Sequence, residues 1–196
     1  SIANSPRNPI YKRCGSCLST ENCRSISLTS VICKVFESIL NDEMLAHLNT
    51  NMQIHNNQHG FLPKRSTQSC LLDIMYDWSL ALNDKHNINS IFIDFKKAFD
   101  SISHTKLIHK LSLDGFSPLV LNWIKAFLSN RMQQVKIGSK HTLSSLLTCT
   151  SGVPQGSALG PLLLNIFIND LVNVCKFGTI KLYADDATLY ARVSSL

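Results

Sequence analysis

Apolar side chains recur every three to four residues in two stretches of the first half of the chain. One stretch covers residues 31–48 and the other residues 67–83, and this spacing predicts a helix in each. The residues between them, 51–66, are polar and include glycine and proline, so we expect a connection there. Residues 1–25 are polar and interrupted by breakers, and are predicted to be irregular. The buried face of the second helix is expected to hold Leu71, Ile74, Met75, Trp78 and Leu82.

The second half of the chain mixes short strand-like runs with helices. Residues 90–94 are rich in β-formers and predict a strand that ends on an acid. The runs 180–184 and 187–192 predict one β-hairpin, and residues 135–148 predict another. Further helices are expected around 105–111, over 118–128 and from Gly160 onward. Helices mixed with short, non-alternating strands predict an α+β fold.

Length and composition suit one domain with a substantial core. The chain has 196 residues, 44% of them apolar, and no run approaches the roughly 20 apolar residues that a membrane span needs. It carries 19 Lys and Arg against 13 Asp and Glu, a net charge of +6 that suits a polyanionic partner without requiring one. The chain starts at Ser1 without a signal peptide and stops at Leu196 soon after an apolar run. We therefore expect both ends to be cuts through a longer, intracellular polypeptide, in the nucleus or the cytoplasm.

The 7 cysteines are an odd number, which does not favour a disulfide framework. Cys14 and Cys17 form a Cys-x-x-Cys pair, and Cys23 and Cys33 could add ligands for zinc. A structural zinc site needs two close pairs, and the second close pair is missing. Free thiols in a reducing compartment are therefore the favoured interpretation.

Two adjacent acids mark the turn of the last predicted hairpin. Asp185 and Asp186 lie between apolar strands, and like charges this close repel unless a cation lies between them. Mg²⁺ takes such hard oxygen ligands, with waters and substrate phosphates completing its shell. An exposed Asp-Asp turn is the alternative.

A third acid, Asp94, also ends a strand-like run. If the two strands are neighbours in one sheet, the carboxylates converge as two-metal phosphoryl transfer requires, with ions about 4 Å apart. Asp94 could instead cap the segment that follows it, and Asp100 is assigned to a helix N-cap.

A glycine- and proline-rich stretch, residues 151–161, precedes the helix predicted from Gly160. Glycines permit a ligand to approach the backbone closely, and a helix N-terminus favours anions. By itself such a stretch is common and not specific.

Five blocks, taken in order, resemble the motifs of reverse transcriptases. They are residues 23–30 (CRSISLTS), 58–61 (QHGF) with 65–67 (RST), 94–100 (DFKKAFD), 152–156 (GVPQG) with 160–161 (GP), and 183–186 (YADD). They cover nearly the whole chain from about Pro9, and the third and fourth are similar to non-LTR (LINE-like) retrotransposons rather than to retroviral enzymes. The resemblance implies an α+β right-hand polymerase, truncated before its thumb. One incomplete domain over residues 9–196 is expected, with fingers at 1–90 and palm at 91–196.

The resemblance also implies which residues carry out the chemistry. Asp94, Asp185 and Asp186 would be catalytic and would hold two Mg²⁺ ions, with Mn²⁺ as a substitute. Arg24 would grip the incoming triphosphate, with Lys12 or Arg13 as its partner. The other residues implied are Phe99, which would exclude a 2′-hydroxyl; Gln155 and Gly156, which would pack on the nucleotide and template; and Lys64 and Arg65, which would face nucleic-acid phosphates.

The reaction implied is RNA-directed DNA synthesis, with an RNA template, a DNA primer and dNTPs as partners and no membrane. A different class remains open, a degenerate or domesticated remnant that binds nucleic acid without catalysis. Ser25, where the family usually has proline, favours the remnant, and the intact acids favour the enzyme. An RNA-templated RNA polymerase is a third alternative, which Phe99 argues against. The isolated chain is expected to be inactive and poorly soluble, with its last strand left as an uncovered apolar edge.

Overall fold

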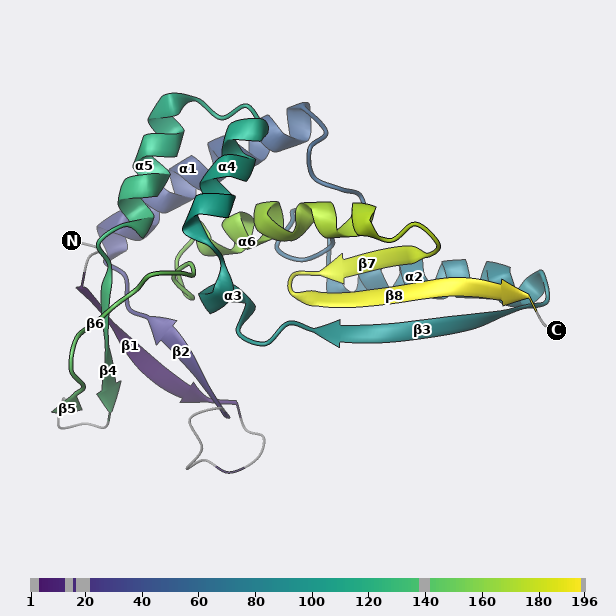
Figure 1. The fold of residues 1–196 in the computed structure, drawn as a ribbon, viewed down its shortest axis with the longest axis horizontal. Helices are drawn as coiled ribbons and strands as arrows, with labels where there is room; N and C mark the ends of the chain where they lie inside the picture. The colour runs from purple at the N-terminus through teal and green to yellow at the C-terminus, as the bar shows by residue number, and fades with distance from the viewer. Residues whose placement is uncertain (1–3, 13–15, 17–21, 138–141, 195–196) are drawn as a thin grey trace. The chain divides into compact units, whose positions relative to one another are not determined.

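The computed structural model describes residues 4–12, 16, 22–137 and 142–194. Within it the chain forms two compact units, and each unit combines two separate stretches of sequence. The first unit comprises residues 1–45 and 99–160. The second unit comprises residues 46–98 and 161–196. Figure 1 shows the helices and strands of both units.

The first unit contains a five-stranded sheet (Figure 1). Its strands are β1 (Asn4–Tyr11), β2 (Cys23–Ser27), β4 (Met132–Ile137), β5 (Thr142–Leu143) and β6 (Leu147–Thr148). β1 pairs antiparallel with β2 and parallel with β4. β4 also pairs antiparallel with β5 and β6, as the hairpin predicted over residues 135–148 requires.

The prediction that residues 1–25 are irregular is wrong for β1 and the start of β2. β1 contains Pro6 and Pro9, which lack a backbone N–H and argue against a strand on local grounds. Its pairing partner β4 lies more than a hundred residues later, at Met132–Ile137, and a local pattern contains no information about that partner.

Two helices of the first unit begin at serine caps. α4 (His104–Leu113) has Ser103 as its N-cap, and α5 (Pro118–Leu128) has Ser117 as its N-cap, followed by proline in its first turn. The two helices pack together over a common apolar core. Buried core side chains of this region are Ile102, Leu107, Leu111, Phe116, Ile124, Phe127 and Leu128.

The second unit contains a three-stranded antiparallel sheet in the order β3-β8-β7. Its strands are β3 (His86–Asp94), β7 (Thr179–Tyr183) and β8 (Asp186–Ser194). Both the strand predicted near 90–94 and the hairpin predicted near 180–192 are confirmed. The expectation that the last strand is an uncovered edge is wrong, because β8 pairs with β3 on one side and β7 on the other. The apolar outer strand is β3, where Phe92 is 73% exposed.

Helix α2 (Thr67–Asn83) covers the bounds predicted for it. Ser66 forms a capping box with Ser69, which fixes the start of the helix. The expected buried face is wrong, however, since Leu71, Met75 and Leu82 are exposed. The residues that α2 buries are Cys70, Ile74 and Ala81, with Trp78 half-buried.

Polar contacts explain why α2 buries a different face from the one expected. Asp73 and Asp77 lie on the same side as Ile74, and their carboxylates pair with Lys181 of β7 and with the Tyr190 hydroxyl of β8. A pattern search that counts only apolar positions assigns these acids to solvent.

Two further elements complete the second unit, helix α6 (Gly160–Ile168) and the 3₁₀ helix η2 (Asn169–Val174). Residues from their ends pack on a small core made by the hairpin. That core consists of Ile180, Leu182 and Ala187, with Ile168, Leu171, Val172, Cys175 and Leu189 packed around it. No helix in the described part of the chain is both long and apolar enough to cross a membrane.

Candidate active site

The three acids singled out by sequence are brought together at one end of the β3-β8-β7 sheet. β3 ends at Asp94, β8 begins at Asp186, and these two residues are direct partners in the antiparallel register. Directly opposed residues on such strands have Cβ atoms about 4.5–5.5 Å apart. Asp185 precedes Asp186 in the turn that joins β7 to β8. The carboxylates therefore gather at one strand end, as expected from two strands that each deliver an acid.

The acids interact electrostatically. Loss of hydration raises the pKa of the Asp186 carboxyl above its ordinary value, and the charges of Asp185 and Asp94 raise it further. This mutual repulsion is what a bound cation would relieve. The three side chains offer only oxygen ligands, which is the donor set that Mg²⁺ prefers.

The same acids do not form a complete protein cage for a metal. Among the described residues, no group of three or more His, Cys, Asp or Glu side chains is arranged to hold an ion. Magnesium at phosphoryl-transfer sites is commonly held by one or two carboxylates, with waters and substrate phosphates as the remaining ligands. The residues present fit that open kind of site.

The turn between the acids and β7 has an unusual backbone. Ala184 has a φ of 55°, in the left-handed region that non-glycine residues seldom adopt, and its side chain is buried. On the side of β7 away from β8, the His59 N–H donates to the Leu182 carbonyl and the Leu182 N–H donates to the Asn57 carbonyl, each at 2.8 Å. Residues 57–59 therefore extend the support of the hairpin beyond the sheet itself.

A network of polar side chains supports β7, with Lys181 and His59 buried and Asp73 and Asp77 partly exposed. The Lys181 ammonium, 9% exposed, pairs with Asp73 and lies 3.9 Å from Asp77. The hydrogen bond from Lys181 lowers the pKa of the Asp73 carboxyl below its ordinary value. Burial lowers the pKa of His59, whose ring lies 3.5 Å from Asp73, so this histidine is neutral at physiological pH. The network ties α2 to the strand that leads into the acidic turn.

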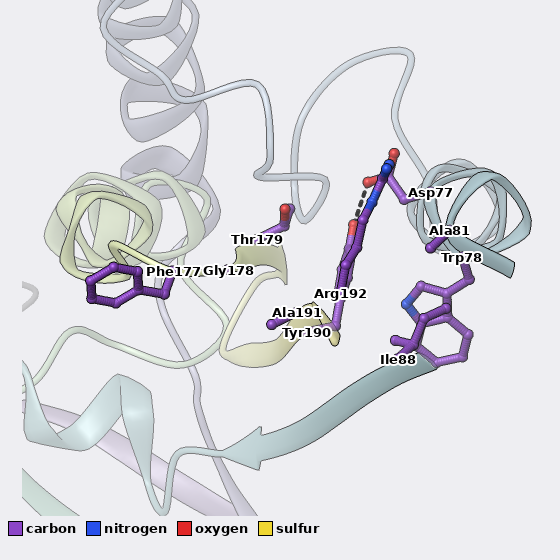
Figure 2. A pocket seen from close by; sticks show the side chains of 10 residues that line it. All are labelled: Asp77, Trp78, Ala81, Ile88, Phe177, Gly178, Thr179, Tyr190, Ala191 and Arg192. Carbon is purple, nitrogen blue, oxygen red and sulfur yellow. Dashed lines mark hydrogen bonds between the residues drawn. The ribbon is translucent and has the colours of Figure 1, made fainter. Parts of the chain in front are cut away.

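A pocket of about 410 Å³ lies at the other end of β8 (Figure 2). Figure 2 shows the hydrogen bond from the Tyr190 hydroxyl to Asp77 at this pocket, and burial together with that bond raises the pKa of Tyr190. Trp78 packs edge-on against Tyr190, with ring centroids 6.0 Å apart. None of the three acids lines the pocket, so it is separate from the acidic site.

In the first unit, the glycine-rich stretch lies against the segment that follows Asp94. The Val153 N–H donates to the Phe99 carbonyl, and the Gly152 N–H donates to the Ile102 carbonyl, both at 2.8 Å. Gly152 has a φ of +82°, and a Cβ on it would lie 2.7 Å from the Asp100 Cα. Phe99, half-buried, is therefore held next to this loop by contacts that only glycine permits.

The assignment of Asp100 to a helix N-cap is wrong. Asp100 lies inside the short helix α3 (Ala98–Ser101), and the residue that caps α4 is Ser103. The Asp100 carboxylate instead pairs with the guanidinium of Arg7, 3.0 Å away, and the Arg7 side chain is only 10% exposed. A buried guanidinium requires a carboxylate partner, and that partner lies 93 residues away in sequence.

Gln155 and Gly156 lie against β2, the strand that carries Arg24. The Ser27 N–H donates to the Gln155 carbonyl at 2.8 Å. Gly156, at a φ of +105°, leaves space for Ile26, whose Cγ2 would lie 2.9 Å from an added Cβ. Arg24 itself is exposed on β2.

The other basic residues have different surroundings. Lys12 is exposed and its backbone N–H pairs with Asn22, whereas Arg13 lies outside the described residues. Lys64 is exposed and has a φ of 60°. The guanidinium of Arg65 donates to the Gln58 carbonyl at 3.0 Å and to Asn56, so it braces the loop beside β7.

The cysteine pair considered for zinc, Cys14 and Cys17, lies outside the described residues. Of the further ligands considered, Cys23 and Cys33 are both free thiols and half-buried.

Sequence patterns missed a buried acid that supports the glycine-rich loop. Glu37 of α1 (Val31–Thr50) is fully buried, and its Oε2 accepts hydrogen bonds from the N–H groups of Ala158 at 2.8 Å and Leu159 at 3.3 Å. Burial raises the pKa of this carboxyl above its ordinary value. A lone acid within an amphipathic helix pattern is usually solvated, so no local signal could have identified it.

Comparison with known proteins identifies related sequences along most of the chain. The family model described as reverse transcriptase (RNA-dependent DNA polymerase) matches residues 10–195. A probable RNA-directed DNA polymerase from transposon BS of Drosophila melanogaster is 31% identical over 153 residues, which are 78% of this chain and 17% of that protein. The RNA-directed DNA polymerase from mobile element jockey of Drosophila funebris is 30% identical over 156 residues, 80% of this chain and 17% of that protein. The chain thus spans less than a fifth of the length of these curated relatives.

Solved structures share the fold at low sequence identity. Telomerase from Candida albicans, in complex with a fragment of telomeric RNA, has a TM-score of 0.69 at 13% identity, over 97% of this chain and 38% of that one. The RNA-dependent RNA polymerase of bacteriophage phi12 has a TM-score of 0.53 at 12% identity, over 86% of this chain and 28% of that one. At these identities the likeness shows the fold alone, and that fold is the expected polymerase type.

Proposed function

Because the chain belongs to the reverse transcriptase (RNA-dependent DNA polymerase) family and is homologous to the polymerases of non-LTR retrotransposons, we propose that the polypeptide containing it synthesises DNA on an RNA template. The reaction is the addition of a dNMP to a primer 3′-hydroxyl with release of pyrophosphate. One observation carries the proposal: Asp94 and Asp186 are direct partners at the end of β3 and β8, next to Asp185. An exposed Asp-Asp turn without function would not require a third acid opposite it.

In this proposal Asp94, Asp185 and Asp186 hold two Mg²⁺ ions, or Mn²⁺ in their place. When bound, the ions would neutralise charge on the attacking and leaving oxygens of the phosphoryl transfer. The contribution of the chain is to hold three carboxylates on a rigid strand end, at the fixed spacing of an antiparallel pair. The buried Lys181 network and residues 57–59 support that rigidity.

Nucleotide selection is assigned to residues of the first unit. Arg24 would contact the triphosphate, with Lys12 or Arg13, and Gln155 and Gly156 would pack on the nucleotide and the template. The hydrogen bond that joins the glycine-rich loop to β2, from the Ser27 N–H to the Gln155 carbonyl, supports this assignment.

Discrimination against ribonucleotides is assigned to Phe99, which the glycine-rich loop holds in place. An aromatic ring selects a deoxyribose by clashing with a 2′-hydroxyl rather than by attracting a 2′-hydrogen. Lys64 and Arg65 are proposed to contact nucleic-acid phosphates. The division into fingers at 1–90 and palm at 91–196 and the intracellular location are also proposals.

The test is primer extension by the complete polypeptide on an RNA template annealed to a DNA primer. We expect incorporation of dNTPs, dependence on a divalent cation, and poor use of rNTPs. Tight binding of the template and primer without any extension would instead support the non-catalytic remnant. Efficient RNA synthesis from rNTPs would support an RNA-templated RNA polymerase.

A further inference from the structure

The Gln-His-Gly-Phe block at residues 58–61 has no role in the chemistry described above, yet it lies against the acidic turn. Gln58 is fully buried, and its side-chain hydrogen bonds go to three backbone groups of two residues, Gly60 and Ala184. Its Oε1 accepts from the N–H of Gly60 at 2.7 Å and from the N–H of Ala184 at 3.0 Å. Its Nε2 donates to the Ala184 carbonyl at 3.4 Å.

Ala184 directly precedes the two acids of the turn, Asp185 and Asp186. It lies between the last residue of β7, Tyr183, and Asp185, so its peptide groups are outside the strand ladder. It is buried and holds a left-handed φ of 55°. A buried backbone without ladder bonds needs other partners, and a strained backbone needs surroundings that hold it. The Gln58 amide supplies both partners at once.

The Gln58 side chain is itself anchored. A Cβ on Gly60 would lie 2.1 Å from the Ala184 nitrogen, so the two backbones are in direct contact and only glycine fits. The Asn165 amide donates to the Gly60 carbonyl at 2.7 Å, and Arg65 donates to the Gln58 carbonyl at 3.0 Å. The clamp on Ala184 is therefore held from several directions within the second unit.

We propose that Gln58 is a positioning residue for the acidic turn: its bidentate clamp on Ala184 sets the orientation of Asp185 and Asp186, and so their affinity for a divalent cation. The cation part of this inference rests on the proposed function, whereas the clamp itself does not. Groups that orient metal ligands from behind typically change metal affinity or activity by about 10- to 100-fold when they are removed.

The test compares three variants of the complete polypeptide. Gln58→Met keeps the size of the side chain and removes every hydrogen bond, and Gln58→Glu keeps the acceptor for the Ala184 N–H. Gln68→Met is the matched control, because Gln68 is exposed on α2. Two quantities are measured on folded protein: hydrogen exchange of the Ala184 amide, and the Mg²⁺ concentration for half-maximal primer extension.

We expect Gln58→Met to accelerate exchange of the Ala184 amide at least about 10-fold and to raise the half-saturating Mg²⁺ by about 10- to 100-fold, as loss of an outer-shell partner does. Affinity for the template and primer should stay unchanged. Gln58→Glu should recover part of both losses, and Gln68→Met should match the unaltered protein.

A purely structural role for Gln58 would lower the folded fraction and leave the half-saturating Mg²⁺ of the remaining enzyme unchanged, which overturns the proposal. Unchanged exchange at Ala184 in Gln58→Met also overturns it. If Gln58→Met does not fold, Gln58→Glu decides, because it loses the donor to the Ala184 carbonyl. Faster exchange at Ala184 with an unchanged half-saturating Mg²⁺ in Gln58→Glu would remove the positioning role. If the unaltered protein shows no extension, the proposed function fails, and hydrogen exchange still tests the clamp.

Discussion

Replacement of Glu37 tests how the glycine-rich loop is held. Its Oε2 accepts two backbone hydrogen bonds, from Ala158 at 2.8 Å and from Leu159 at 3.3 Å. Hydrogen bonds to a charged group contribute about 1.5–3 kcal/mol each, and the longer bond belongs at the low end of that range. Desolvation of the carboxylate, which raises its pKa, offsets part of this gain. We therefore expect Glu37→Leu to reduce the local free energy of opening by about 2–4 kcal/mol, and Glu37→Gln by about 1 kcal/mol, because the amide keeps one acceptor.

The assay is hydrogen exchange of the amides of Ala158 and Leu159 in the complete polypeptide. A loss of about 2–4 kcal/mol corresponds to exchange about 30- to 900-fold faster. Glu43→Leu, an exposed position on the same helix, is the matched control and should leave both amides unchanged. Equal exchange in Glu37→Leu and Glu43→Leu would refute the account of the loop.

The same carboxyl predicts a dependence on pH. Burial raises the pKa of Glu37 above its ordinary value of 4.5, so the folded protein binds this proton more tightly than the unfolded chain does. The contribution of Glu37 to stability is therefore greatest below 4.5 and falls as pH rises through its folded pKa. The difference in stability between the unaltered protein and Glu37→Gln should shift in favour of the unaltered protein as pH is lowered through that window. A difference that is flat with pH would contradict this reasoning.

Three further results are expected. Phe99→Val in the complete enzyme should raise the ratio of rNTP to dNTP efficiency, and an unchanged ratio would remove Phe99 from the site. Asp73→Asn should lower the free energy of unfolding by about 1–3 kcal/mol, because the buried Lys181 loses its closest partner. Because the pairing with Lys181 lowers the pKa of Asp73, the stability that this pair contributes should be lost as pH falls below 3.8 through the folded pKa. The isolated chain of 196 residues should lack polymerase activity, and robust primer extension by the purified chain would be the contrary result. The chain should also aggregate through the exposed strand β3, so Phe92→Lys should improve its solubility in a sedimentation assay.

The features that the sequence predicts correctly depend on local signals. Helical spacing of apolar side chains predicts α2 over its observed bounds and α5 over residues 118–128. The convergence of Asp94 with Asp185 and Asp186 is predicted because each acid ends a strand-like run, and neighbouring strands bring their ends together. Resemblance of five ordered blocks then identifies the family.

The features that sequence patterns do not predict depend on partners far away along the chain. β1 exists because β4 pairs with it, and α2 turns its acids inward because Lys181 and Tyr190 meet them. Glu37 and Gln58 are polar residues that resemble surface positions until their partners, the backbone N–H groups of other segments, are known. A burial pattern read from one segment carries no information about such partners.

The acidic site is tested most directly by Asp94→Asn and Asp185→Asn in the complete polypeptide, assayed by primer extension on an RNA template. Each change keeps the size of the side chain and removes a charge, and Asp42→Asn on the exposed side of α1 is the matched control. Loss of a metal carboxylate removes several kcal/mol of transition-state stabilisation, so extension should fall at least about 100-fold while affinity for the template and primer is retained. Extension by Asp185→Asn or Asp94→Asn at the rate of Asp42→Asn would contradict the assignment of the active site.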